Sequence, residues 1–292
     1  MYSYLECKLV NTWGIMYNCD IFNPNENNTS YEIYLDSINW DSIKPRSTLY
    51  IGLEYLKYFI DNFFYKLKVP IILVTGHGDT EPCKEIIEDE RIIHWFSQNA
   101  NFDHIKLTKI PIGLDYHTLA TRDNYTSWGD VLKSPLEQEC HLLTIESLDI
   151  NKQLKCYSNF RYRVFCRKYT DDRIDAINNV PEDLVYYEPE FLLRIVSWLK
   201  QKHFRFVISP QGNGLDCHRT YEALALGCIP ILKSSPIDSL FDDLPVLIVK
   251  KWSDVTKELL EKTSEEYSNK QFKMEKMSLV YWNNLINSYK TI

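Results

Sequence analysis

Residues 209–233, SPQGNGLDCHRTYEALALGCIPILK, decide how the second half of the chain folds. An apolar strand at 204–209 leads into a loop with two glycines, a helix follows at about 218–226, and a second apolar strand occupies 229–232. Strand, glycine loop, helix and strand are typical of the half-Rossmann unit, in which free backbone N–H groups and the positive end of the helix dipole favour a bound phosphate. The stretch therefore predicts a parallel sheet with a phosphate site at the start of the helix.

The helix carries two side chains that suit a nucleoside diphosphate. Arg219 and Glu222 lie three residues apart and should project from one face. A cation beside a helix N-terminus suits a diphosphate, and a carboxylate one turn further suits sugar hydroxyls. We expect Arg219 to bind the diphosphate with help from the backbone amides of Gly212 and Gly214, and Glu222 to accept hydrogen bonds from a ribose.

Three further residues are candidates for the donor side. Ser209 ends the first strand of the unit, and His218 begins the helix, where a contact with the diphosphate and simple packing both remain open. Arg167 lies in a basic loop after the first strand of the second half and is a second phosphate candidate, although such a charge run is more often a solvated face. Asp216 would be awkward beside a diphosphate, and we expect it to cap the helix by accepting N–H bonds.

Two glycines alone do not specify a nucleotide site. Cys217 stands where a dinucleotide fingerprint has its third Gly or Ala, and no Gly-Lys-Ser/Thr follows, so a P-loop is absent. A sugar-nucleotide epimerase or an NAD-linked dehydrogenase stays an alternative. The only Tyr-x-x-x-Lys pair, Tyr4 to Lys8, precedes any nucleotide-binding unit and weighs against it.

The whole string SP-x-GNGLDCHRTYEAL-x-LGCIPI resembles the C-terminal signature of the exostosin-like glycosyltransferases (family 47 type), where SPRGNG-x-DCHR-x-WEAL is a common form. Residues 234–240, 244–246 and 251–254 resemble the continuation of that family, and LVTGHGD at 73–79 and KIPIGLD at 109–115 resemble its N-terminal landmarks, with WFSQ at 95–98 between them. The chain departs from the pattern at three positions: Gln211 replaces a basic residue, Tyr221 a frequent Trp, and His77 interrupts what is often Asp-Ser-Asp.

The resemblance implies an α/β protein of GT-B architecture, with two facing Rossmann-like domains that each hold a parallel sheet. It also implies an inverting transfer of a sugar, with xylose as the first guess, from a UDP-sugar to a hydroxyl of an oligosaccharide or glycan acceptor. Similar short members without a membrane anchor occur in large algal viruses. A non-catalytic relative that binds a glycan or a nucleotide sugar stays an alternative, because the departures include the acceptor side.

The reaction needs a base on the acceptor side, and hence in the first domain. Asp79 and His77 follow a predicted parallel strand and are the candidates, with Asp115 third. An ordinary turn role is as common for residues in a Gly-x-Gly-Asp segment.

Alternating strands and helices predict a parallel sheet in each half. In the first half we expect strands at 48–51, 71–75 and 105–110, and helices at 53–65, 85–90 and 135–148. In the second half we expect strands at 155–158 and 186–187 and helices at 171–179 and 189–201 before the glycine unit. We place a domain at 1–150, a second at 151–275, and at 276–292 a helix that crosses back to the first, within an amphipathic tail at 268–289.

Composition bounds the partners. The chain has 292 residues, 45% of them hydrophobic, and a net charge of −7, which argues against a nucleic-acid or anionic-membrane partner. No stretch approaches about 20 apolar residues and no leader pattern opens the sequence, so we expect a cytoplasmic protein without membrane insertion. Eight cysteines include no Cys-x-x-Cys pair and should be reduced. No Asp-x-Asp and no cluster with metal spacing is found, so we expect no metal and no cofactor beyond the UDP-sugar substrate.

Overall fold

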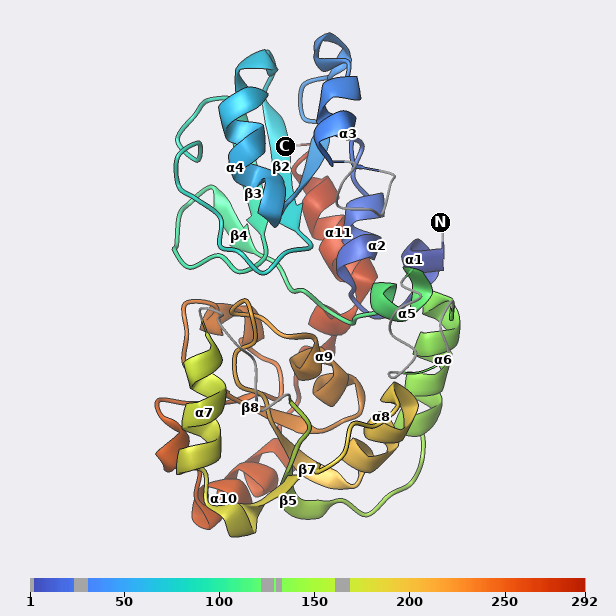
Figure 1. Ribbon diagram of the computed structural model, residues 1–292, viewed down its shortest axis with the longest axis vertical. Coiled ribbons are helices and arrows are strands. Elements are labelled where there is room, and N and C mark those ends of the chain that lie inside the picture. The colour runs from blue at the N-terminus through green and yellow to red at the C-terminus, as the bar shows by residue number, and fades with distance from the viewer. Residues whose placement is uncertain (1–2, 24–30, 122–128, 130–132, 161–168, 292) are drawn as a thin grey trace. The chain divides into compact units, whose positions relative to one another are not determined.

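The computed structural model describes residues 3–23, 31–121, 129, 133–160 and 169–291 (Figure 1). Contacts within the chain divide it into two compact units, Met1–Ile112 with Ser278–Ile292, and Gly113–Met277. Each unit contains one wholly parallel sheet, of four strands in the first and five in the second, among the described residues. The protein is therefore an α/β protein, as the alternation of strands and helices predicts.

The sheet of the first unit has the strand order β1-β2-β3-β4. Its strands are β1 (Thr48–Gly52), β2 (Ile71–Gly76), β3 (Ile92–Ser97) and β4 (Leu107–Lys109). Every residue of β1 and β2 is buried, which is typical of parallel strands that are covered on both faces. The described helices of this unit are α1 (Ser3–Glu6), α2 (Thr12–Tyr17), α3 (Tyr31–Ser37), η2 (Trp40–Ser42), α4 (Leu53–Asn62), η3 (Phe64–Lys66) and α11 (Leu279–Ser288).

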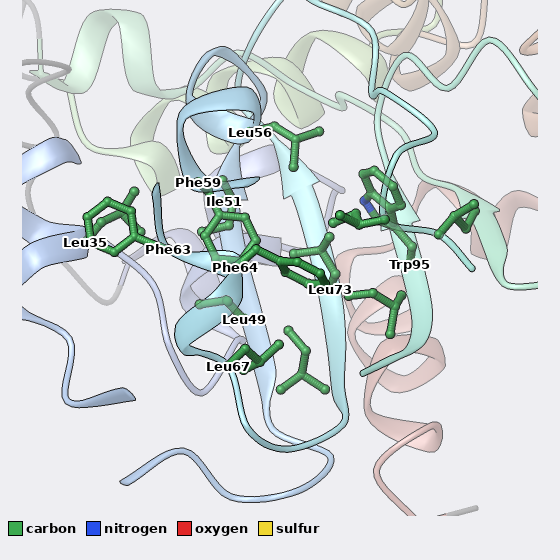
Figure 2. Packing of buried hydrophobic residues seen from close by; sticks show 14 of the residues in the cluster. Leu35, Leu49, Ile51, Leu56, Phe59, Phe63, Phe64, Leu67, Leu73 and Trp95 are labelled. Carbon is green, nitrogen blue, oxygen red and sulfur yellow. The ribbon is translucent and has the colours of Figure 1, made fainter. Parts of the chain in front are cut away.

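The core of the first unit lies between its sheet and α4. Figure 2 shows Leu56 and Phe59 of α4 in one cluster with Leu49 and Ile51 of β1 and Leu73 of β2. All five side chains are buried, and each such burial contributes about 1.5–3 kcal/mol. This cluster fixes the helix that follows β1 against the sheet.

The sheet of the second unit has the order β6-β5-β7-β8-β9. Its strands are β5 (Gln153–Ser158), β6 (Val185–Tyr187), β7 (Phe204–Ile208), β8 (Ile229–Lys233) and β9 (Leu247–Val249). Its described helices are α5 (His117–Thr121), α6 (Pro135–Glu146), α7 (Thr170–Asn179), η5 (Glu182–Leu184), α8 (Arg194–Lys202), α9 (His218–Ala225), η6 (Asp238–Phe241), η7 (Trp252–Asp254), α10 (Lys257–Ser268) and η8 (Met274–Met277).

Most predicted strands are confirmed to within one or two residues, but the helix predicted at 85–90 is wrong. That segment forms turns, with hydrogen bonds from Ile87 N–H to Lys84 O and from Asp89 N–H to Ile86 O. Its two apolar residues, Ile86 and Ile87, are adjacent and both buried, whereas a helix buries residues three or four apart. So short a segment also gains little against the cost of nucleating a helix.

Two predicted helices have different limits in the structure. The helix predicted at 189–201 begins only at Arg194. Residues 189–193, which begin with Pro189, have no regular secondary structure. The helix predicted at 276–292, within the amphipathic tail, is α11 and is shorter, from Leu279 to Ser288. The tail also contains the end of α10 at Ser268, and the N–H of Leu279 donates to Lys8 O.

The division between the units differs from the boundary predicted near residue 150. It falls after Ile112, so α6 belongs to the second unit. Buried polar bonds hold α6 there: Gln138 donates to Tyr116 O at 2.7 Å and accepts from Arg194 of α8 at 3.1 Å. Ser278–Ile292, the segment expected to return to the first domain, is counted in the first unit, where α11 packs against α2 (Figure 1).

Helices of the described part of the chain are all too short or too polar to cross a bilayer.

Candidate functional site

The strand order of the second sheet locates a candidate site. From β5 the chain passes to β6, which is the neighbour of β5 on one edge. It then returns to β7, which is the neighbour of β5 on the opposite edge. Open α/β sheets bind ligands outside the carboxyl ends of the strands at such a reversal. The segments that leave these ends are Asn159 and Phe160 after β5, and the glycine loop, residues 209–217, after β7.

The predicted strand–loop–helix–strand unit is confirmed. β7 and β8 pair in parallel, and α9 connects them (Figure 1). The glycine loop is tied to α7, where Asp172 accepts from Gln211 N–H at 2.9 Å and Arg173 donates to Gln211 O at 3.2 Å. A Cβ on Gly212 would lie 2.9 Å from Cys217 Sγ, so the loop needs a glycine at this position.

Two groups expected on the donor side make hydrogen bonds within the glycine unit. Ser209 is buried, and its hydroxyl lies 2.9 Å from Thr220 Oγ1. The Gly212 N–H donates to Gly214 O at 3.2 Å. These bonds give Ser209 and the Gly212 amide structural roles.

Asp216 does not cap the helix in the predicted way. Cys217 is the N-cap residue of α9, and no side chain makes the cap hydrogen bond. The buried Asp216 carboxylate accepts from Cys217 N–H at 2.9 Å and from the Tyr221 hydroxyl at 2.7 Å. It therefore joins the loop to the buried face of α9.

Arg219 lies in the first turn of α9. It is partly exposed, and its guanidinium is 5.4 Å from the ring centroid of Phe160, the residue that leaves β5. Within the described residues Arg219 makes no hydrogen bond or ion pair, whereas the guanidinium groups of Arg173 and Arg194 are hydrogen-bonded. The strand reversal therefore holds a cation beside a helix N-terminus, and no described carboxylate pairs with it.

His218 and Glu222 lie one turn apart on α9 and share a second group of neighbours. His218 Nδ1 donates to Gly113 O at 2.7 Å, since a carbonyl can only accept. Burial raises the pKa of Glu222, while the charges of Arg194 and His218 act in the opposite direction. The nearby indole of Trp198 also acts to lower the pKa of Glu222, but the indole N–H makes no regular hydrogen bond. The surroundings of Glu222 thus differ from those of Arg219.

Asp115 is the centre of this second group. Its carboxylate accepts from Arg194 Nη2 at 2.8 Å and from Thr118 N–H at 3.0 Å, and His117 Nδ1 lies 3.2 Å away. Arg194 Nη1 also donates to the backbone carbonyl of Asp115. Burial alone would raise the pKa of Asp115, but the charges of His117 and Arg194 outweigh it and hold that pKa well below the usual range. Asp115 is therefore a buried carboxylate that stays ionised.

Asp115, His117 and His218 are the described residues that could hold a cation, since one ligand-type atom of each lies within 4.8 Å of the others. Their bonding favours another use. The guanidinium of Arg194 would repel a divalent ion beside Asp115, and Thr118 N–H already donates to the other carboxylate oxygen, from which His117 Nδ1 lies 3.2 Å away. We therefore describe these residues as an acid–base cluster.

The two base candidates of the first unit follow β2. His77 has a left-handed φ of 50°, its N–H donates to the Gln98 side chain at 2.8 Å, and its Nδ1 accepts from the Trp13 indole at 3.2 Å. Asp79 is exposed, and its N–H donates to Glu54 at 3.1 Å. A buried polar network therefore holds the backbone and ring of His77 at the carboxyl end of the sheet.

The structure brings His218 and Glu222 together with Asp115, and Arg219 with Phe160. Arg167 lies outside the described residues. Sequence reasoning missed Arg194 and His117. The Asp115-Tyr-His117 spacing was the one local signal for the cluster, since Arg194 reaches it from 79 residues away along the chain.

No protein-family model and no curated protein sequence matches this chain.

Proposed function

We propose that this protein is an inverting glycosyltransferase of GT-B architecture that transfers a sugar from a UDP-sugar to a hydroxyl of a glycan. The observation that carries the proposal is the guanidinium of Arg219 in the first turn of α9, beside the glycine loop and at the strand reversal, which has no acidic partner among the residues that the structure describes. A site of this kind attracts a diphosphate, because a helix N-terminus carries about half a positive charge and the guanidinium adds a full one.

The same charges suit the chemistry. When the bond between the sugar and the diphosphate breaks, negative charge grows on the leaving oxygen. A cation already in place stabilises that charge more in the transition state than in the ground state. We assign this role to Arg219, and we assign recognition of the ribose hydroxyls to Glu222. Xylose is our first guess for the transferred sugar, from the resemblance to exostosin-like enzymes.

The test compares UDP binding and UDP-sugar turnover in the parent protein and in Arg219→Ala. Loss of one charge-assisted contact costs about 1.5–3 kcal/mol, or roughly 10- to 150-fold in affinity for UDP by calorimetry. Release of UDP from a panel of UDP-sugars should fall by a larger factor. Arg205→Ala is the matched control, because Arg205 is a partly buried arginine of β7 that bonds to Ser268 of α10.

Two results would reject the proposal. Equal affinity of the parent and Arg219→Ala for UDP would remove the diphosphate from α9. Binding of UDP-sugars without any turnover in the parent protein, with or without a glycan acceptor, would leave a binding protein in place of an enzyme.

The Glu222→Gln variant tests the ribose assignment. The neutral amide should weaken UDP binding and leave inorganic diphosphate binding unchanged. The 2′- and 3′-deoxy forms of UDP should lose less affinity in this variant than in the parent. An equal loss in both proteins would show that the ribose contacts another group.

A further inference from the structure

The first unit contains a cavity that is lined by none of the candidate site residues that the structure describes. The cavity measures about 480 Å³ and lies between residues 20–22 and the segment from Tyr34 to Ser47. We propose that this cavity is a second ligand site, which binds a pyranose unit of a neutral oligosaccharide. Sugar binding at this site requires neither UDP nor sugar transfer, so the inference goes beyond the proposed function.

The cavity lies at the amino end of β1. Its lining residue Ser47 directly precedes β1, and its lining residue Asp20 accepts from the Thr48 N–H at 2.9 Å and from the Thr48 hydroxyl at 3.0 Å. The base candidates His77 and Asp79 follow the carboxyl end of β2. Because β1 and β2 are parallel, the cavity and these two candidates belong to opposite edges of the sheet.

One wall of the cavity is held beside β1 by backbone hydrogen bonds. The Ile21 N–H donates to Thr48 O at 3.1 Å, and Ile21 O accepts from the Tyr50 N–H at 2.8 Å. The ring of Phe22 packs edge-on against that of Tyr17, with 5.2 Å between the ring centroids. This wall therefore has a fixed position on the sheet.

The other wall rests on the hydrophobic core of the unit. α3 buries Leu35, which belongs to the same cluster as Phe59 and Phe63 (Figure 2). Trp40 of η2 stacks on both phenylalanine rings, at centroid distances of 6.0 and 5.8 Å. Both walls are thus packed in the absence of a ligand, and a pre-formed cavity of about 300–1,000 Å³ is typical of small-molecule sites.

The floor of the cavity is apolar. Ile21, Tyr34 and Ile38 are partly buried against the hydrophobic core, and Ile43 is part of that core. The ring of Phe22 is also partly exposed there. A pyranose ring has C–H groups on its two faces, and packing one face on this floor removes apolar surface of both partners from water.

The rim of the cavity offers both hydrogen-bond donors and acceptors. The side chains of Asn39, Lys44 and Ser47 make no hydrogen bond or ion pair with another described residue. Ser37 and Ser42 donate their hydroxyl hydrogens to backbone carbonyls three residues earlier, at 2.7 Å in each case. Their oxygens therefore remain as acceptors. This mixture suits sugar hydroxyls, because each of them donates and accepts.

The charges of the cavity argue against other classes of ligand. Among its described lining residues Lys44 is the one cation and Asp20 the one carboxylate. Asp20 is already bonded to Thr48 and, at 2.9 Å, to Lys290. A divalent cation takes six or more oxygen ligands, and a nucleotide diphosphate needs more positive charge than one exposed lysine provides. A neutral ligand with many hydroxyls fits better than either.

The experiment titrates the nitrogen-15-labelled parent protein with xylobiose, cellobiose, lactose, maltose and chitobiose, one at a time and without UDP. At least one of these sugars should cause saturable shifts of the backbone amide signals of residues 20–22, 37–39 and 42–47. Binding in the millimolar range is expected, because the site is open and its hydrogen bonds are few. The signals of residues 76–79, at the opposite edge of the sheet, should move less.

Three variants test the rim with the best of these sugars. Asn39→Ala, Lys44→Ala and Ser47→Ala remove side chains that bond no other described residue, so each variant should fold like the parent. Loss of one hydrogen bond to the sugar should weaken binding about 2- to 12-fold. Asn62→Ala and Lys68→Ala are the matched controls, since both residues are exposed in the same unit and lie outside the cavity. Both controls should keep the parent affinity.

The possible results are distinct. The proposal would be overturned if no sugar gave saturable shifts at the cavity residues, or if the shifts clustered on other residues. Equal affinity of the parent and all three rim variants would overturn it as well. Displacement of the bound sugar by inorganic phosphate would make the cavity an anion site at Lys44 instead. None of these measurements involves UDP, so each result leaves the proposed function to its own test.

Discussion

Replacement of Arg194 by methionine should destabilise the second unit more than any other removal of a single cation there. Arg194 and Asp115 are both buried and meet at 2.8 Å, and the same arginine bonds Gln138 at 3.1 Å. Methionine fills most of the volume but leaves the carboxylate of Asp115 without the guanidinium that balances its charge. Removal of one member of a buried ion pair typically costs about 3–5 kcal/mol.

The lower part of this range is the better expectation for Arg194→Met, because Asp115 still accepts from Thr118 N–H at 3.0 Å and His117 Nδ1 still lies 3.2 Å from its carboxylate. A loss of about 3 kcal/mol corresponds to a fall in Tm of roughly 6–12 °C in a unit of this size. The matched control is Arg219→Met, which removes the same charge from the same unit. Arg219 makes no ion pair within the described residues, so its loss should cost only about 0.5–1 kcal/mol, the value of its contact with Phe160.

The pH dependence of the difference has a definite sign. In the parent the folded pKa of Asp115 lies below its unfolded value, so the pair stabilises the fold above the unfolded pKa and this contribution is lost as the pH falls through the folded pKa. In Arg194→Met, protonation of Asp115 relieves the uncompensated charge as the pH falls. The difference in unfolding free energy between the two proteins should therefore be largest near neutral pH and should shrink as the pH falls towards 3.8, the ordinary pKa of an aspartate, and below it.

Scanning calorimetry and chemical denaturation of the two variants and the parent, from pH 8 to pH 3, measure these differences. Asp115→Asn in the Arg194→Met background should recover part of the loss, because it removes the buried charge that Arg194 had balanced. Equal stability of the parent and Arg194→Met at pH 8 would refute the view that Asp115 is a buried carboxylate dependent on this arginine. This view would also be refuted if the losses of stability caused by Asp115→Asn and by Arg194→Met simply added in the double variant.

Three further predictions concern other parts of the chain. Gly212→Ala should cost about 1–3 kcal/mol in thermal unfolding, because its Cβ would lie 2.9 Å from Cys217 Sγ; Cys217→Ala in the same background should restore most of the loss, and no recovery would contradict the clash. Burial lowers the pKa of His94 from 6.5 to about 4, so between these pH values the unfolded chain binds a proton that the folded protein does not, and the free energy of unfolding falls as the pH falls. His94→Phe should therefore flatten the dependence of the unfolding free energy on pH between 6.5 and 4. An unchanged slope would contradict this. UDP release measured in excess chelator should equal that with added Mg²⁺ or Mn²⁺, because Arg219 and a helix N-terminus supply the positive charge.

The glycine unit of the second half could be predicted from the sequence because its determinants are local. Residues 204–233 contain two runs of apolar residues, and the helix between them buries residues at helical spacing, Tyr221 and Leu224 on one face. Gly227 ends that helix with a φ of 65°, a conformation that favours glycine. Each of these features depends on neighbours within about one turn, so a single sequence is enough to specify them.

The division of the chain could not be predicted in the same way. α6 has a clear start signal, a capping box between Ser134 and Glu137, and its position along the chain was predicted well. Its membership of the second unit depends on Gln138, which bonds to Arg194, 56 residues further along the chain. Nothing in the spacing of α6 announces that partner, because a glutamine at a helical position is compatible with either a solvated or a buried face.

The chain order explains why the proposed donor side could be anticipated and the polar group around Asp115 could not. Arg219 follows a glycine loop directly, so its chemistry is apparent from adjacent letters. The group around Asp115 becomes apparent only when two distant contacts are known: Arg194 bonds Asp115 across 79 residues, and His218 bonds Gly113 across 105. The first contact balances the buried charge of Asp115, and the second fixes α9 beside the segment that carries Asp115. Because both partners come from distant parts of the sequence, no local spacing could have announced this group.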